Sequence, residues 1–192
     1  MSIRDILRAC APVMPVVVIE DAANAVPLAK ALAEGGLGGI EVTLRTAAGV
    51  DAIAAIASEM PDFVVGAGTV LNNAQMQAVA DAGAQFAVSP GLSAGIIDAA
   101  KTAGVPLLPG VLTPSEVIMA LDAGLDTLKF FPASIGGGVP ALKAFGGPFG
   151  DVRFCPTGGI SANNAADYLA LKNVMCVGGS WIADAKAIRD GD

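Results

Sequence analysis

Lys129 stands inside the apolar segment TLKFFP (127–132), which predicts a buried strand. Burial disfavours a charged ammonium group relative to the neutral amine, and a neutral amine is a nucleophile toward the carbonyl carbon of a ketone. Imine formation is therefore the chemistry that this side chain could perform. A structural alternative exists, because a lysine in a strand can also extend its ammonium group to solvent or pair with a carboxylate.

Glu41 is the candidate proton-transfer partner of Lys129. The sequence has no histidine, which removes the commonest general acid or base at neutral pH and the commonest ligand of catalytic zinc. A carboxylate beside a lysine can move protons between the carbinolamine and enamine stages of imine chemistry. A structural ion pair between Glu41 and either Lys129 or Arg45 is the alternative explanation of these charges.

Two glycine pairs predict an anion site. Gly158 and Gly159 precede a predicted helix, while Gly178 and Gly179 precede Ser180. Backbone N–H groups in such loops, with a helix amino terminus behind them, bind phosphate. Because a single glycine pair usually marks only a turn, the prediction depends on the presence of both.

The elements that must position these residues alternate regularly along the chain. Eight runs rich in Val, Ile, Leu and Phe recur about every 20 to 25 residues and predict strands centred near Val17, Glu41, Val65, Ala87, Leu108, Lys129, Phe154 and Cys176. The intervening segments predict helices over 22–34, 47–60, 74–82, 94–103, 115–123, 139–145 and 163–170. Candidate N-caps precede most of these helices, namely Asp21, Thr46, Asn73, Ser93, Thr113 and Ser161.

This alternation predicts parallel strands with helices outside, and eight units predict a closed (β/α)8 TIM barrel, an α/β fold, as one domain over residues 1–192. An open doubly wound sheet is the alternative, weakened because no glycine-rich fingerprint follows the first strand. A leading helix over 2–10 is expected to plug the lower mouth of the barrel, and a disordered start is its alternative.

The period of two along a strand predicts which side chains meet inside the barrel. Glu41 and Arg45 share the inner face of the second strand, and Lys129 and Phe131 share that of the sixth. The seventh strand repeats the pattern with Arg153, Cys155 and Thr157. Active sites of such barrels lie at the carboxyl ends of the strands, with phosphate often bound after strands seven and eight. The residues expected at carboxyl ends are Arg45, Thr69, Phe131 and Thr157.

The composition argues against several classes of protein. The chain has 192 residues, 54% hydrophobic and 15% charged, which favours one core, and its formal net charge of −7 provides no basic stripe for a nucleic acid. No apolar run approaches the roughly 20 residues of a membrane span and no basic, cleavable leader begins the chain, so a cytoplasmic protein is expected. Cys10, Cys155 and Cys176 form no CxxC pair and are expected to be small core residues.

Six ordered motifs resemble those of the 2-keto-3-deoxy-6-phosphogluconate (KDPG) aldolases. They are EVTLRT at 41–46, GAGTV at 66–70, SPGL at 89–92, KFFPA at 129–133, RFCPTGGI at 153–160 and GGSW at 178–181. The resemblance extends over residues 13–192. It implies a (β/α)8 barrel, commonly a homotrimer, that acts as a class I aldolase of the Entner-Doudoroff pathway without a metal or other cofactor. The implied reaction is the reversible cleavage of KDPG to pyruvate and glyceraldehyde 3-phosphate.

The resemblance also implies roles for individual residues. Lys129 corresponds to the Schiff-base lysine and Glu41 to the general acid and base. Arg45 and Thr69 would hold the carboxylate and keto-acid end of the substrate. The remaining implied contacts are Pro90 and Phe131 around pyruvate, with Gly158, Gly159, Gly179 and Ser180 on the phosphate and Thr157 nearby.

Two departures from the family pattern lead to further expectations. Ser134 follows the KFFPA motif where the family often has Glu, which is expected to alter the polarity near the mouth of the site without affecting the imine chemistry. The sequence ends at Asp192, shortly after Trp181. The final helix is therefore expected to be truncated, leaving the eighth strand with less apolar cover.

Alternative functions remain open on the sequence alone. The same imine chemistry would serve a related keto acid, such as 2-keto-4-hydroxyglutarate or the galactonate epimer. A non-catalytic oligomeric barrel scaffold is a second possibility. A phosphate-binding isomerase or epimerase is a third, although such enzymes do not require a lysine at the centre of the sixth strand.

Overall fold

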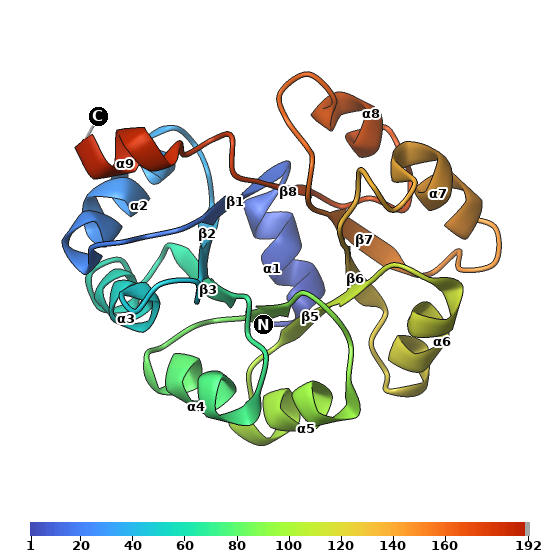
Figure 1. Cartoon of the computed structure of the whole chain (residues 1–192), viewed down its shortest axis with the longest axis horizontal. Helices are drawn as coiled ribbons and strands as arrows, with labels where there is room; N and C mark the ends of the chain where they lie inside the picture. The colour runs from blue at the N-terminus through green and yellow to red at the C-terminus, as the bar shows by residue number, and fades with distance from the viewer. Residues whose placement is uncertain (191–192) are drawn as a thin grey trace.

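The computed structural model describes residues 1–190, which form a barrel of eight parallel strands with helices outside (Figure 1). The expected (β/α)8 barrel is therefore confirmed. The strands are β1 Val13–Val17, β2 Gly39–Thr43, β3 Val64–Gly68, β4 Ala87–Ser89, β5 Leu107–Val111, β6 Thr127–Phe130, β7 Arg153–Pro156 and β8 Val177–Gly179. The helices are α1 Ile3–Cys10, the 3₁₀ turn η1 Ala22–Asn24, α2 Ala25–Glu34, α3 Gly49–Glu59, α4 Asn73–Asp81, α5 Ala94–Ala103, α6 Pro114–Asp122, α7 Gly138–Phe145, α8 Ala165–Leu169 and α9 Ala185–Asp190.

The barrel closes at a seam between β7 and β8. Each strand from β1 to β7 pairs in parallel with its sequence neighbour, and β1 also pairs with β8. Between β7 and β8, by contrast, the contact consists of isolated bridges that pair Phe154 with Val174 and Thr157 with Gly178. The two strands are joined there by the amide of Met175, which donates to the carbonyl of Phe154 at 3.0 Å.

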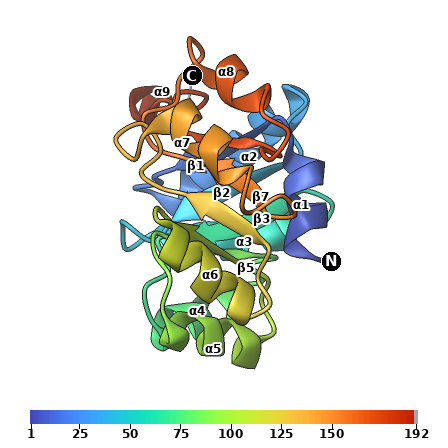
Figure 2. The same ribbon diagram turned by 90° about the vertical axis from the view of Figure 1, so that its right-hand side faces the viewer.

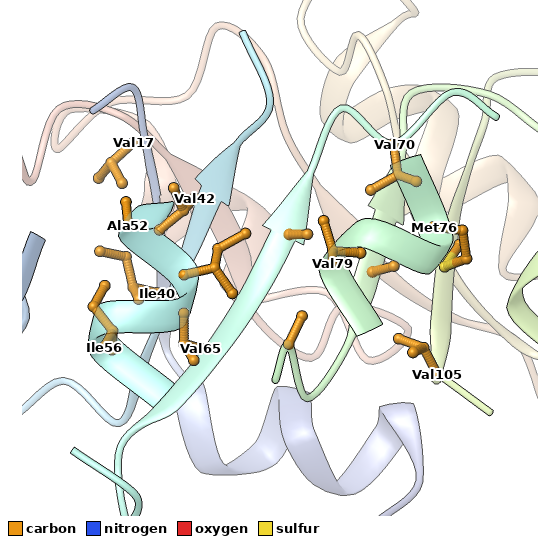
Figure 3. Close-up of a cluster of buried hydrophobic side chains, with 14 of the residues drawn as sticks. Val17, Ile40, Val42, Ala52, Ile56, Val65, Val70, Met76, Val79 and Val105 are labelled. Carbon is orange, nitrogen blue, oxygen red and sulfur yellow. The ribbon is translucent and has the colours of Figure 1, made fainter. Parts of the chain in front are cut away.

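Strand side chains divide between an outer and an inner apolar layer, as the period of two predicts. Outward residues pack beneath the helices, and Figure 3 shows Ile40, Val42 and Val65 of β2 and β3 facing Ala52 and Ile56 of α3. A second outer cluster joins β6 and β7 to α7 and α8. Inward residues at the lower end form a separate cluster that includes the three cysteines, all buried and free, so their expected place in the core is confirmed.

Helix α1 covers the amino-terminal end of the barrel, seen at the right in Figure 2. Ile6, Leu7 and Cys10 are at most 1% exposed. They pack with inward side chains that include Phe86 before β4 and Leu108 of β5. The expected plug at the lower mouth is thus confirmed.

Several predicted N-caps are confirmed. The hydroxyl of Ser93 accepts from the amide of Ile96 at 3.3 Å, and that of Thr113 accepts from the amide of Glu116 at 3.3 Å. Asp21 accepts from the amide of Ala23 at 2.9 Å, although it caps the 3₁₀ turn rather than an α-helix.

Three predicted N-caps are wrong. Helix α4 is capped by Asn72, one residue before the predicted Asn73. The hydroxyl of Thr46 donates to the carbonyl of Ile19 at 2.5 Å, joining two loops instead of starting a helix. The amide of Ser161 donates to the side chain of Asn164 at 2.9 Å, because a turn separates Ser161 from α8.

Strand β8 is not left uncovered. Val177 of β8 has no exposed surface and packs in the same cluster as Tyr168 of α8. The expectation that the eighth strand loses apolar cover is therefore wrong for Val177. Helix α9 lies beside α2 (Figure 1), where Ile188 packs against the cluster that contains Val26. Within residues 1–190 no helix is long and apolar enough to cross a membrane.

Candidate active site

Lys129 and Glu41 meet at the centre of the barrel. Lys129 of β6 is 5% exposed and Glu41 of β2 is 3% exposed. The Lys129 Nζ atom lies 3.5 Å from Glu41 Oε1. Their sequence neighbours Leu128 and Ile40 belong to the outer clusters, so both charged side chains point inward as the strand alternation predicts. A nucleophile and a proton acceptor therefore lie within reach of one carbonyl group.

Glycines on β3 make room for these groups. A Cβ atom on Gly68 would overlap Glu41 Oε1 and lie 2.8 Å from Glu41 Cγ. A Cβ atom on Gly66 would overlap the ring of Phe86. The GAGT segment therefore packs its backbone closely inside the barrel, and Gly68 in particular leaves the space that the Glu41 carboxylate occupies.

Phe131 covers Lys129 from the carboxyl end of the barrel. It follows the last residue of β6, and its ring centroid lies 5.0 Å from Lys129 Nζ. A ring face at this distance attracts an ammonium group and excludes water from it. Phe131 also lines the hollow described next, so the same side chain borders both the hollow and the buried lysine.

A hollow of about 380 Å³ opens at the carboxyl end of the strands. Its lining includes the predicted residues Arg45, Phe131, Thr157, Gly158, Gly159, Gly179 and Ser180. Arg45 is exposed, and it forms no ion pair or hydrogen bond with any other residue of the described chain. Its guanidinium group is therefore available to a carboxylate or phosphate.

The loop after β7 has the backbone that an anion site requires. Gly158 and Gly159 have φ angles of +97° and +74°, in the region that favours glycine. Their carbonyls accept from the Ser134 amide at 3.0 Å and the Asn164 side chain at 3.1 Å, which fixes the loop. The amide of Gly159 donates to no acceptor within residues 1–190. Gly159 must lack a side chain, because a Cβ atom there would overlap the Ser134 hydroxyl.

Thr69 and Pro90 lie at the same end of the barrel but do not line this hollow. Thr69 directly follows β3 and has a φ of +61°, an unfavourable value for a β-branched residue. Such local strain persists where the surrounding structure imposes it, often at ligand-binding positions. Pro90 follows β4, and its carbonyl lies where a Cβ atom on Gly110 would be.

Arg153 differs from its expected inward placement. Its Nη1 atom donates to the carbonyls of Gly150 at 2.8 Å and Val152 at 3.0 Å. The guanidinium group therefore folds back along the chain at the start of β7, since α1 already fills the lower end of the barrel. Cys155 and Thr157 are buried, with 2% and 7% exposure.

The cysteines are poor candidates for catalytic nucleophiles. Burial, together with the nearby Cys155, raises the pKa of the Cys10 thiol to about 12. A hydrogen bond of 3.4 Å with Cys155 and burial raise the pKa of the Cys176 thiol. Both thiols are therefore protonated at neutral pH and unreactive. In the part of the chain that the structure describes, no group of three or more His, Cys, Asp or Glu side chains is arranged to hold a metal ion.

One wall of the hollow was not predicted from the sequence. Ala183, Asp184, Ala185 and Ile188 line it from the start of the last helical segment. The Oδ1 atom of Asp184 accepts from the amides of Lys186 at 2.9 Å and Ala187 at 3.3 Å. An Asp followed by a short helical pattern could have indicated this cap, but not the direction in which the helix turns across the hollow.

Comparison with known proteins gives consistent results. The sequence profile of the family described as KDPG and KHG aldolase matches residues 3–192. The KHG/KDPG aldolase of Escherichia coli (strain K12) is 56% identical over 181 residues, which cover 94% of this chain and 85% of that protein. The 2-dehydro-3-deoxy-phosphogluconate aldolase of Pseudomonas aeruginosa (strain PAO1) is 50% identical over 182 residues, covering 95% and 83%.

A solved structure agrees with these sequence matches. The KDPG aldolase of Legionella pneumophila, with pyruvate captured as a covalent carbinolamine intermediate, superposes on this chain with a TM-score of 0.94. The two sequences are 45% identical, and the superposition covers 97% of this chain and 91% of the other.

Proposed function

This chain belongs to the KDPG and KHG aldolase family, and from that premise we propose a reaction and a role for each site residue. The reaction is the reversible cleavage of KDPG to pyruvate and glyceraldehyde 3-phosphate by a class I, Schiff-base aldolase. The observation that carries the residue assignment is the buried pair of Lys129 and Glu41, with 3.5 Å between Nζ and Oε1.

A structural role explains this pair poorly. The pair has one contact at the long end of the hydrogen-bonding range, and both side chains are at most 6% exposed. Removing two charges from water costs several kcal/mol, which only an excellent geometry recovers. A single long contact does not provide that geometry. The pair instead places a proton acceptor within direct reach of the amine that would attack a carbonyl carbon.

The cleavage proceeds through bonds to Lys129. Proton transfer from Lys129 to Glu41 leaves a neutral amine, which attacks C2 of the keto acid. The carbonyl oxygen receives one proton from the amine and one from Glu41 and leaves as water, so an iminium remains. Glu41 then removes the proton of the C4 hydroxyl, the C3–C4 bond breaks and its electron pair forms the enamine while the aldehyde departs. Protonation at C3 and hydrolysis release pyruvate and Lys129.

The surrounding residues hold the two ends of the substrate. Arg45 binds the carboxylate, with Thr69, Pro90 and Phe131 enclosing the pyruvate portion near Lys129. The donors proposed for the phosphate are Gly158, Gly159, Gly179 and Ser180, with Thr157 beside them. The free amide of Gly159 in the loop after β7 and the shared hollow support this assignment.

Reductive trapping tests the assignment of Lys129. Incubation with pyruvate and borohydride should add the mass of one reduced pyruvate adduct, and peptide mapping should place it on Lys129. The Lys129→Ala variant should lose both the adduct and KDPG cleavage, while Lys101→Ala, an exposed lysine on α5, should retain both. An unchanged mass, or full cleavage activity in Lys129→Ala, would contradict the proposal.

A related keto acid is the second candidate substrate, because the matching family is described for both KDPG and KHG. Ser180→Ala separates the two. For a phosphorylated keto acid the variant should raise KM with little change in kcat, since it removes a donor from the remote end of the substrate. For 2-keto-4-hydroxyglutarate, which lacks a phosphate, the same variant should leave KM unchanged. The galactonate epimer of KDPG provides the stereochemical comparison.

We also propose that the protein is a homotrimer in the cytoplasm. Large apolar side chains are exposed on α6 and on the loop after β6, with Ile118 51%, Met119 54% and Ile135 83% accessible. Exposed apolar groups of this kind mark protein interfaces. Sedimentation velocity should give the mass of three chains, and a monomer would contradict this part. Aldol cleavage at an ordinary enzymatic rate would exclude the non-catalytic scaffold.

A further inference from the structure

A second hollow lies at the opposite end of the barrel from the proposed active site. It occupies about 500 Å³ between α7 and α8, which lie side by side (Figure 1). Its lining includes Arg153, the first residue of β7, so it belongs to the amino-terminal end of the strands. Lys143 and Lys172 line it as well, and no Asp or Glu does. On a chain with a net charge of −7, this is a local concentration of positive charge.

The cations of this hollow are not neutralised by the protein. Within residues 1–190, Lys143 and Lys172 form no ion pair and no side-chain hydrogen bond. Arg153 uses its Nη1 atom on two backbone carbonyls, while its Nε and Nη2 groups have no acceptor in that part of the chain. Three positive side chains therefore border one space, and none of them is paired with a carboxylate in the described part of the chain.

Neutralisation of helix ends does not explain the two lysines. Lys143 lies in the last turn of α7 and Lys172 follows α8, positions where a cation could serve the terminal carbonyls. Other donors already occupy several of those carbonyls. Leu142 accepts from Asn173 Nδ2 at 2.8 Å and from the Gly146 amide at 3.2 Å, and the carbonyl of Ala166 in α8 accepts from Ala170 at 3.0 Å. Neither ammonium group donates to one of them.

Backbone amides add further hydrogen-bond donors to this hollow. The amides of Gly150, Lys172 and Asn173, all on the lining, donate to no acceptor in the described part of the chain. Amides together with Lys and Arg side chains are the donors that recognise a phosphoryl group, whose oxygens accept from several directions. Leu171 adds an apolar wall that could contact a carbon skeleton.

We infer that this hollow is a second anion site, which binds a phosphorylated small molecule through Lys143, Arg153 and Lys172. Its volume of about 500 Å³ exceeds the need of a bare phosphate ion and falls in the range of small-molecule sites. The inference is independent of the reaction proposed for Lys129, because the two hollows share no lining residue.

Amide chemical shifts measured by NMR test the two hollows separately in one titration of the whole chain. Inorganic phosphate and glycerol 3-phosphate should each produce saturable shifts at Gly150, Lys172 and Asn173, with a tighter midpoint for glycerol 3-phosphate. Shifts at Gly158 and Gly159 report the proposed active site. The double variant Lys143→Gln/Lys172→Gln should weaken the first set about tenfold, because two charges are lost. It should leave the second set and aldol cleavage unchanged.

A matched variant controls for net charge. Lys30→Gln/Lys101→Gln removes two exposed lysines from α2 and α5, and Lys101 also lies in the last turn of its helix. This control should leave the shifts at Gly150, Lys172 and Asn173 unchanged. Non-saturable shifts there, or equal weakening in both double variants, would overturn the inference. Saturation only at Gly158 and Gly159 would overturn it and leave the proposed function intact, and binding of glycerol 3-phosphate no tighter than that of phosphate would exclude an organic ligand.

Discussion

Gly68 determines where the Glu41 carboxylate can lie, although it is neither polar nor close to Lys129 in sequence. A Cβ atom at this position would overlap Glu41 Oε1, the atom that is 3.5 Å from Lys129 Nζ. The lack of a Cβ atom at Gly68 therefore allows the short distance between the proposed nucleophile and its proton partner. The active site therefore requires glycine at position 68 as well as the charged groups themselves.

Gly68→Ala should lower kcat for aldol cleavage by about 100-fold, because the added methyl group displaces the Glu41 carboxylate from Lys129. Steady-state kinetics provide the measurement. Gly91→Ala is the matched control, since a Cβ atom there meets no other atom within 4 Å. If Gly68→Ala folds with the thermal stability of Gly91→Ala and retains full activity, the position of Glu41 does not control the reaction as proposed.

The inward placement of Glu41 and Lys129 followed from a local rule, because a strand alternates its side chains regardless of the rest of the fold. The placement of Arg153 did not follow from this rule. It depends on α1, which fills the lower end of the barrel and precedes Arg153 by more than 140 residues in the sequence. The wall formed by Asp184 and Ile188 was missed for a similar reason. Its position depends on how the final segment crosses the barrel face.

The start of helix α6 is fixed by two residues of its own sequence. Thr113 accepts from the Glu116 amide, and Glu116 accepts from the Thr113 amide at 2.7 Å, which forms a reciprocal capping box. Partial burial raises the pKa of Glu116, but hydrogen bonds from the amides of Leu112 and Thr113 outweigh it and hold that pKa below its usual value. The cap therefore favours the charged carboxylate.

Glu116→Gln should destabilise the protein by about 1 kcal/mol near neutral pH. Because the folded-state pKa of Glu116 is lowered, its ionisation stabilises the fold above the unfolded pKa of about 4.3 and ceases to do so as the pH falls through the folded value. Urea unfolding at about pH 7 and about pH 3 should show a smaller difference from the parent at the lower pH. Glu34→Gln, an exposed position at the end of α2, should show little difference at either pH.

Helix positions were predictable to within a few residues, whereas the starts of individual helices were predictable only where the cap immediately precedes the helix. Ser93 and Thr113 meet that condition, and both form the expected bond. Thr46 and Ser161 stand in longer connections whose path is set by other loops. A hydroxyl with several acceptors nearby does not by itself fix the start of a helix.

Helix α1 links the whole barrel, because its buried face contacts inward residues from strands on different sides. Leu7 has no exposed surface and belongs to the cluster that includes Val64, Leu108 and Cys155. Those three residues come from β3, β5 and β7. Loss of contacts at Leu7 is therefore expected to weaken the barrel as a unit.

Leu7→Ala should reduce the free energy of unfolding by about 3 kcal/mol through lost burial and the cavity that it leaves. Urea unfolding followed by far-ultraviolet circular dichroism and by Trp181 fluorescence should shift equally if the chain unfolds as a single domain. Leu71→Ala, at a position 58% exposed, should change stability by less than about 0.5 kcal/mol. Separate transitions for the two probes would contradict the single-domain prediction.

A substrate bound at the seam between β7 and β8 would also stabilise the folded barrel. Only isolated bridges pair these strands, and the loops that follow them carry the proposed phosphate donors Gly158 and Ser180. A phosphate bound by both loops would connect the two edges of the barrel. A ligand that binds only the folded state, at 100 times its dissociation constant, stabilises it by about 2.7 kcal/mol. The enzyme would then resist proteolysis best in a cell that supplies its substrate, and be removed soonest in one that does not.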